Sequence, residues 1–297
     1  MDLIESGTRS APNAISSSEI TAAARMLGSA GGGTGAAKLL SLMYDENVTA
    51  QEILRCVRTQ PTLAARVLKV ANSAYYRCSG KVGTLERAVV LLGLPAIRGI
   101  AATACMDRLP LPSARIVIDP QRLRQHSLAV ALAAQSFSQR TGAGVDAEAF
   151  MAGLLHDVGI VMLAWLRPEA VATLSRLPAI HPSTVVEKEL DLIGTDHASA
   201  AAQLVQVWGL PSWLGQALQS HHVIDDPVRW SGIEALPAIL ILADRCAQDA
   251  GFGVWATEAV ALDAAWSKSL GLDQQIYDEV VRGLAVSLTG LTAGLTA

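Results

Sequence analysis

The sequence contains few charged residues, and it has no excess of basic side chains. Only 17% of its 297 residues are charged; 23 lysines and arginines against 27 aspartates and glutamates leave a net charge of −4. This balance provides no positive surface for nucleic acid or for an anionic membrane, so we expect neither as a partner. Because 51% of the residues are hydrophobic, the chain can bury a sizeable core, which excludes a disordered protein.

The sequence also lacks an uninterrupted apolar run of about 20 residues, the length that crosses a bilayer. Its longest apolar runs, residues 152–166 and 236–243, are shorter than this or are interrupted by polar side chains. We therefore expect no membrane-spanning helix. The N-terminal stretch MDLIESGTRS carries acidic residues where a secretory signal is basic, and this predicts a cytoplasmic protein.

Cysteine is scarce as well. The four cysteines are too widely spaced for a paired metal-binding motif and too few for a disulfide framework. We expect them to be buried thiols: Cys56, Cys78, Cys105 and Cys246.

Helical periodicity dominates what the sequence does contain. From residue 36 onward, apolar residues recur at three- and four-residue spacing, and alternating β-branched runs are few. This pattern predicts an all-α protein. A proline-bearing segment, LPLPSARIVIDP, predicts a boundary between two helical halves. The expected organisation is a disordered or loosely attached tail at residues 1–17, helical halves at 18–109 and 120–250, and C-terminal helices of the same domain at 251–297.

The stretch MAGLLHDVGIVML, residues 151–163, places His156 and Asp157 inside an otherwise apolar run. Burying an unpaired carboxylate in such surroundings costs several kcal/mol. The charge of Asp157 therefore has to be compensated by a neighbouring group.

Four further histidines and one aspartate occupy helical positions that could converge on this pair. His126 and His197 fall on apolar helix faces, His221 and His222 at the last turn of a short helix, and Asp244 at the end of an apolar run. Imidazoles and carboxylates in this combination have the composition of a metal site.

Each of these residues also has a simpler interpretation. A lone inward histidine is usually a satisfied core residue, Asp244 could pair with Arg245, and His156 with Asp157 could cap a local turn. The sixth histidine, His181, precedes a proline and is expected in an exposed loop.

Several stretches resemble an HDOD domain, a relative of the HD-type metal phosphohydrolases. QPTLAARVLKVANSAYYR and TLERAVVLLGLPAIRGI are similar to its first half. GLLHDVG, GTDHASAAAQLVQVWGLPSWLGQALQSHH and ILADRCA are similar to its second half. The resemblance covers roughly residues 37–250 and implies a multi-helix HD-like bundle in two packed helical halves.

The resemblance also implies a set of metal ligands. The first metal of HD enzymes is held by a histidine, a His-Asp pair and a distal aspartate, which correspond to His126, His156, Asp157 and Asp244. In the branch that hydrolyses cyclic dinucleotides, further histidines hold a second metal, and these correspond to His197, His221 and His222. Iron, manganese and zinc all suit such ligands. Asp157 is the one candidate for a catalytic role, and no other cofactor is expected.

Two departures from that branch bear on activity. Ile160 stands where the enzymes carry a lysine, and VIDDPVRW after His222 lacks their glutamate and Gly-Tyr-Pro element. We therefore expect a bacterial regulatory module that acts through contacts with a signalling protein, with little or no hydrolytic activity, alone or as a homodimer. The alternative is a metal-dependent phosphohydrolase acting on a nucleotide or a cyclic dinucleotide.

Overall fold

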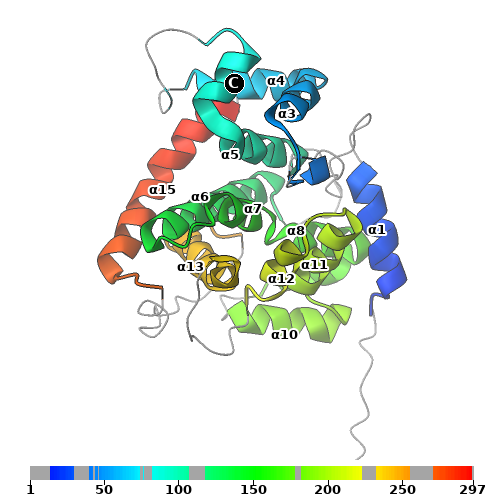
Figure 1. Cartoon of the computed structure of the whole chain (residues 1–297). Helices are drawn as coiled ribbons and strands as arrows, with labels where there is room; N and C mark the ends of the chain where they lie inside the picture. The colour runs from blue at the N-terminus through cyan, green and yellow to red at the C-terminus, as the bar shows by residue number, and fades with distance from the viewer. Residues whose placement is uncertain are drawn as a thin grey trace, which may run out of the picture.

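The computed structural model is all-α across the residues that it describes (Figure 1). These residues are 14–29, 40–42, 44–45, 47–73, 76, 82–106, 118–177, 182–222, 232–254 and 270–295. Within these ranges there are 13 α-helices, one short 3₁₀ helix and no strand. The all-α prediction is confirmed. Cys78 lies outside the described ranges, as do residues 107–117 of the predicted boundary.

The helices fall into two groups. The first half contains α3 (Ala50–Arg58), α4 (Pro61–Ala71) and α5 (Leu85–Met106). The second half contains α6 (Pro120–Thr141), α7 (Asp146–Leu155), α8 (Val158–Leu166), α9 (Pro168–Leu174), α10 (Pro182–Ile193), α11 (His197–Val207), α12 (Ser212–Gln219), η2 (Gly232–Ala235) and α13 (Leu236–Asp249). Two helices outside these groups are α1 (Ser17–Ser29) and α15 (Gln274–Leu295).

Local sequence signals explain where several helices begin and end. Thr49 and Glu52 form a capping box at the start of α3. The side chain of Asp119 caps α6, and Gly142 ends that helix in the left-handed conformation with φ of 67°. Gly209, with φ of 69°, separates α11 from α12 as the Gly-Leu-Pro sequence predicts.

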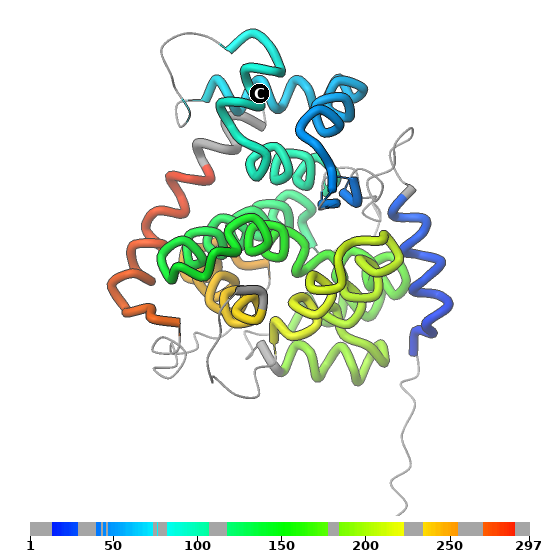
Figure 2. Tube along the Cα trace, in the orientation of Figure 1, coloured from blue at the N-terminus to red at the C-terminus, as the bar shows by residue number. Residues whose placement is uncertain are grey.

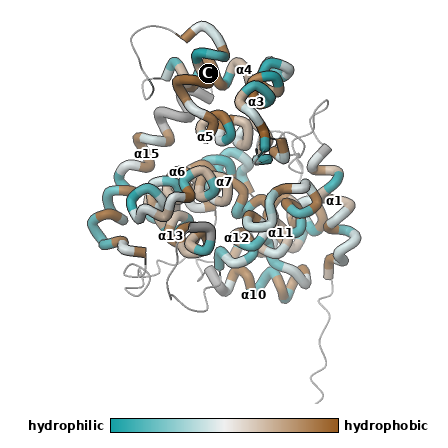
Figure 3. The backbone as a smooth tube through the Cα atoms, in the orientation of Figure 1, coloured by the Kyte–Doolittle hydropathy of each residue, from teal (hydrophilic) through white to brown (hydrophobic). Residues whose placement is uncertain are grey.

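One hydrophobic core is continuous through both halves. Figure 2 shows α6 and α7 at its centre, with α5 on one side and α13 on the other. The C-terminal helix α15 runs along the side of the molecule and contacts α4, α6 and α13. Figure 3 shows hydrophobic residues recurring along the helices of both halves. The two halves therefore bury their apolar faces against each other.

The N-terminal helix α1 packs with the second half, against α8 and α11, although its sequence position placed it in the first. The indole Nε1 of Trp208 donates to the carbonyl oxygen of Ala24 at 2.8 Å. The amide of Ile15 donates to the carbonyl oxygen of Ile193 at 3.0 Å. Residues 14–17, the described end of the expected loose tail, are thus attached to the fold, while residues 1–13 lie outside the described ranges.

Two segments are long and apolar enough to cross a membrane by length and composition alone, Leu85–Met106 and Asp146–Leu166. The first is interrupted by Gly93, whose φ is 75°, and the second contains the His-Asp pair between α7 and α8. The most apolar window of the second segment is 83% buried within the protein. Core helices of globular proteins pass the same test, so these segments are weak evidence for membrane insertion.

Two glycines that flank the His-Asp pair allow its helices to approach their neighbours closely. A Cβ at Gly153 would lie 2.7 Å from the Cα of Ala131 on α6. A Cβ at Gly159 would overlap the carbonyl oxygen of His197 on α11. Because both obstacles are backbone atoms, only glycine fits at these positions without separating the helices.

We predict that Gly159→Ala lowers the free energy of unfolding by about 3 kcal/mol, since α8 and α11 would have to move apart. Chemical denaturation followed by far-UV circular dichroism measures this change. The matched control is Gly283→Ala in α15, where an added Cβ meets nothing within 4 Å. That variant should gain about 0.5–1 kcal/mol from helix propensity. Equal effects of the two substitutions would contradict the close approach of α8 and α11.

Candidate metal centre

The structure brings all seven predicted ligands together from six helices of the second half. They occupy the following positions: His126 within α6, His156 and Asp157 at the junction of α7 and α8, His197 at the first residue of α11, His221 and His222 in the turn just after α12, and Asp244 within α13. Five of the seven are buried, and His222 and Asp244 are half-buried.

The first group of ligands surrounds the Nε2 atom of His126. This nitrogen lies 3.2 Å from Nε2 of His156, 3.4 Å from Oδ2 of Asp157 and 3.3 Å from Oδ1 of Asp244. Nε2 of His156 is also 3.3 Å from Oδ2 of Asp157. Three donor atoms, from His126, His156 and Asp157, therefore converge on one point, and Asp244 approaches them beside His126.

The second group consists of His197, His221 and His222, and Asp157 connects it to the first. The Nε2 atoms of His197 and His222 are 2.7 Å apart. Oδ1 of Asp157 lies 3.5 Å from Nε2 of His197, while its Oδ2 faces the first group. The ligand atoms of His126, His156 and Asp157 lie within 4.8 Å of one another, and so do those of the three histidines of the second group. A single carboxylate thus contacts both groups, one oxygen to each.

Four of the histidines are oriented by a hydrogen bond from the other ring nitrogen, Nδ1. The acceptors are Phe252 O for His126 at 3.0 Å, Gly153 O for His156 at 2.8 Å, Leu218 O for His221 at 2.5 Å, and the Glu189 carboxylate for His197 at 2.7 Å. Carbonyl and carboxylate oxygens only accept, so each Nδ1 must carry the proton. In the neutral imidazole this leaves Nε2 as a bare lone pair directed into the site.

These bare nitrogens need a positive group between them. Nε2 of His126 and Nε2 of His156 are in contact at 3.2 Å although Nδ1 holds the proton of each neutral ring. Nε2 of His221 is buried and has no hydrogen-bond partner in the described part of the chain. A buried acceptor without a partner is costly, and either an additional proton or a metal ion would satisfy it.

The separations in the first group suit ligands of one metal ion. Two donor atoms each about 2.1 Å from an ion are about 3.0 Å apart at an angle of 90° and about 3.4 Å apart at the tetrahedral angle. The Nε2 atoms of His126 and His156 lie 3.2–3.4 Å from each other and from the carboxylate oxygens that they contact. The residues therefore fit a divalent transition metal in donor type, number and spacing.

Protons compensate the buried carboxylates when no metal ion is bound. Burial by itself lowers the pKa of His126, but contacts with Asp157 and Asp244 outweigh it and raise the pKa to about 10. Burial likewise lowers the pKa of His197, and Glu189 raises it to about 9. Burial raises the pKa of Asp157, yet the surrounding histidines, His156 foremost, bring it well below its usual range. Asp157 is therefore ionised, with cationic imidazoles around it.

His221 behaves in the opposite way. Burial and the neighbouring His156 and His197 lower its pKa to about 3. Burial and His221 also bring the pKa of His222 well below its usual value. Both imidazoles are consequently neutral and available as ligands at neutral pH.

The simpler interpretations of these residues do not describe the structure. The guanidinium of Arg245 pairs with Asp249, with Nε 2.8 Å from Oδ1, and not with Asp244. Asp157 stands at the N-cap of α8 but makes no capping hydrogen bond through its side chain. His181, expected in an exposed loop, lies outside the described residues.

Sequence reasoning missed Glu189, which supports His197 from α10. Glu189 is 1% exposed. Its carboxylate accepts two hydrogen bonds from His197, one from the backbone amide and one from Nδ1. The sequence does indicate that Glu189 is buried, because Val185 and Ile193 lie four residues to either side and place it on the apolar face of its helix. The carbonyl partners of the other histidines have no sequence signature.

We predict that Glu189→Gln weakens metal binding about 10- to 100-fold, because residues that orient a ligand typically contribute this much. Competition with a chelator of known affinity measures the effect. Glu187→Gln, at an exposed position of the same helix, is the matched control and should bind metal like the wild type. Unaltered affinity in Glu189→Gln would contradict the orienting role.

Comparison with solved structures gives the same fold. An HDOD domain protein from Geobacter sulfurreducens is 21% identical with a TM-score of 0.68, over 92% of this chain and 98% of that one. A candidate phosphohydrolase from Shewanella amazonensis SB2B is 24% identical with a TM-score of 0.65, over 93% of this chain and 97% of that one. A candidate signal transduction protein from Marinobacter aquaeolei VT8 is 21% identical with a TM-score of 0.64, over 94% of this chain and 65% of that one.

Comparison of sequences identifies the family. An uncharacterised protein of Treponema pallidum is 25% identical over 192 residues, and the chain spans only 36% of the length of that curated relative. Residues 34–224, well over half of the chain, match the HDOD domain family. The chain belongs to the HDOD family, which is related to the HD phosphohydrolases.

Proposed function

We propose that this protein is a metal-binding signal-transduction module that acts through contacts with a protein partner and has little or no hydrolytic activity. The observation that carries the metal-binding part is the convergence of Nε2 of His126, Nε2 of His156 and Oδ2 of Asp157, which lie 3.2–3.4 Å from one another. The HDOD family and the signal-transduction name of one structural relative support the regulatory part.

The residues divide into two groups with one shared member. A first ion would be held by His126, His156, Asp244 and Oδ2 of Asp157. A second ion would be held by His197, His221, His222 and Oδ1 of Asp157. When bound, a divalent ion supplies positive charge and can lower the pKa of a coordinated water. The chain contributes rigid orientation, since the Nδ1 hydrogen bonds fix the ring of each of the four most buried histidines.

At position 160 the site has an isoleucine instead of the lysine that could help to hold a phosphate in the related enzymes. Phosphodiester hydrolysis depends on positioning the phosphate as well as on activating water. Ile160 is 2% exposed and has neither charge nor a side-chain donor. Among the described residues, every ion pair at the seven ligands joins a histidine to a carboxylate, and none involves lysine or arginine. This composition favours metal binding without efficient turnover.

The second candidate is a metal-dependent phosphohydrolase acting on a nucleotide or cyclic dinucleotide. It is favoured by the clustering of seven candidate ligands, with Asp157 in contact with histidines of both groups. In this alternative Asp157, which contacts both groups, would be the residue on which activity depends most. Stoichiometry and turnover measurements separate the two candidates.

We predict that the reconstituted protein binds one or two divalent transition-metal ions per chain, measured by equilibrium dialysis and elemental analysis. Asp157→Asn should reduce the bound metal by at least half, because it removes the carboxylate shared by the two groups. Asp191→Asn, at an exposed position of α10, should bind as the wild type does. Sub-stoichiometric metal in the wild type, or full occupancy in Asp157→Asn, would overturn the metal-binding proposal.

We further predict that the protein loaded anaerobically with manganese or iron hydrolyses cyclic di-GMP at least about 100-fold more slowly than 1 s⁻¹, an ordinary enzyme rate. The reason is the missing phosphate-holding group at Ile160. Product formation followed by chromatography measures the rate. Turnover near 1 s⁻¹ that disappears in Asp157→Asn would establish the phosphohydrolase instead of the regulatory module.

A further inference from the structure

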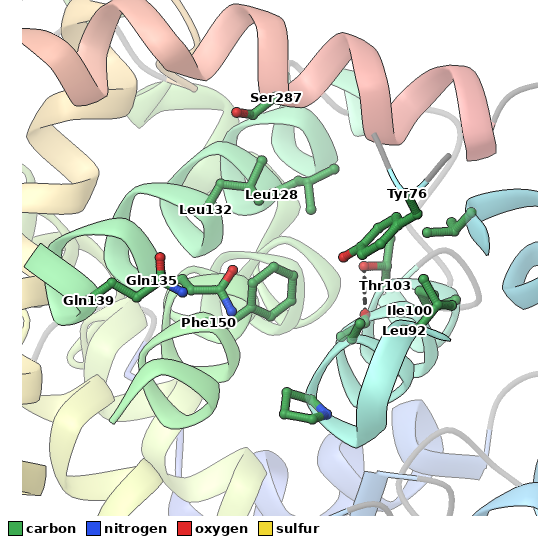
Figure 4. A pocket seen from close by; sticks show the side chains of 14 residues that line it. Tyr76, Leu92, Ile100, Thr103, Leu128, Leu132, Gln135, Gln139, Phe150 and Ser287 are labelled. Carbon is green, nitrogen blue, oxygen red and sulfur yellow. Dashed lines mark hydrogen bonds between the residues drawn. The ribbon is translucent and has the colours of Figure 1, made fainter. Parts of the chain in front are cut away.

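A cavity of about 290 Å³ lies where the two halves meet (Figure 4). Its walls come from α4 and α5 of the first half, from α6 and α7 of the second half, and from α15. Figure 4 shows Leu128 and Leu132 of α6 on one side, and Ile100 and Thr103 of α5 on the other. A molecule in this cavity would contact both halves at once.

The cavity is distinct from the candidate metal centre. The four residues that α6 contributes are Leu128, Leu132, Gln135 and Gln139, which recur at four- and three-residue spacing and so share one face of the helix. At about 100° per residue, Leu128 lies about 200° around the helix from His126. The cavity and the metal ligand are therefore on opposite faces of α6.

The contact between α5 and α7 closes one side of the cavity. A Cβ added at Gly99 would lie 2.8 Å from Cε1 of Phe150, so the ring of Phe150 packs directly on the backbone of α5. Phe150 belongs to α7, the helix that ends at the candidate ligand His156. The wall formed by Phe150 is consequently part of the same helix that positions the metal centre.

The chemistry of the lining selects a class of ligand. Among the described residues that line the cavity, none is a lysine, arginine, aspartate, glutamate or histidine. The hydroxyl of Thr103 donates to the carbonyl oxygen of Gly99 at 2.9 Å, so its proton is already used. The amides of Gln135 and Gln139 make no hydrogen bond within the described residues, and Gln135 is half-buried. The described part of the lining is thus mostly apolar, carries no charged side chain and offers free amide groups on α6.

We propose that this cavity is a binding site for a small neutral amphipathic molecule, with an apolar body between α5 and α6 and a carbonyl-containing head group hydrogen-bonded to the amide of Gln135. A volume of about 290 Å³ accommodates about ten non-hydrogen atoms at the molar volume of a small liquid molecule. A charged head group is disfavoured, because the described lining residues offer no opposite charge to offset its desolvation.

Titration calorimetry with N-hexylacetamide, a neutral amide of this size, tests the proposal. The metal-free and metal-loaded full-length protein should both bind this probe. Heptanoate and hexylammonium, which carry a charge on the same hexyl chain, should bind at least about tenfold more weakly. Absence of binding up to the solubility limit of N-hexylacetamide, or equal affinity for the three probes, would overturn the proposed site.

Two variants locate the binding. Ala96→Phe fills the cavity from α5 and should abolish binding of N-hexylacetamide, with circular dichroism and the thermal midpoint confirming that the variant is folded. Gln135→Leu preserves the apolar volume and should weaken binding about tenfold, the effect of one lost hydrogen bond. Gln121→Leu, at an exposed position on the same helix, should bind as the wild type does. Unchanged affinity in Gln135→Leu would contradict the assignment of the head group, and unchanged affinity in both Ala96→Phe and Gln135→Leu would place the binding elsewhere.

Discussion

The negative charge of Asp157, buried between two apolar helices, is the constraint on which the second half of the structure depends. The residue is 6% exposed, and a carboxylate at such a position requires direct compensation. Histidines from α6, α7 and α11 supply it, each held by a hydrogen bond at its opposite ring nitrogen. The close approach of α8 to α11, which only Gly159 permits, brings His197 within reach of the same carboxylate. Packing and electrostatics are thus satisfied by one arrangement of helices.

The same arrangement explains why a regulatory role is compatible with an intact set of ligands. The ligands come from helices that form the centre of the fold, and several of these helices also contact α1, α5 or α15. Occupation of the centre would therefore act on helices that also pack against the rest of the fold. Catalysis requires more than this, because a substrate phosphate needs its own binding groups, and Ile160 does not provide one. The cavity between the halves uses the opposite face of α6 and so adds a second place at which a small molecule could contact the same helices.

Sequence periodicity was sufficient for the all-α class and for the inward orientation of His126 and His197, because the spacing of apolar residues reports directly which helix face is buried. The motif around His156 and Asp157 identified the charge that needed compensation. The sequence did not reveal that α1 packs on the second half, since the contact of Trp208 with Ala24 joins segments far apart in the chain. The acceptors for the rings of His126, His156 and His221 are backbone carbonyls, which every residue has and no motif marks. Glu189 is the exception, because a glutamate on an apolar helix face could have been recognised as a partner for a buried histidine.

Anomalous diffraction from crystals of the full chain grown with manganese tests the metal-binding claim most directly. We predict one or two anomalous peaks among the seven ligands, with the first peak about 2.0–2.4 Å from Nε2 of His126 and His156. That peak should also contact Oδ2 of Asp157, the atom that faces both rings in the present structure. A site without a peak at saturating manganese, with the two Nε2 atoms still in direct contact, would contradict the assignment of these residues as a metal centre.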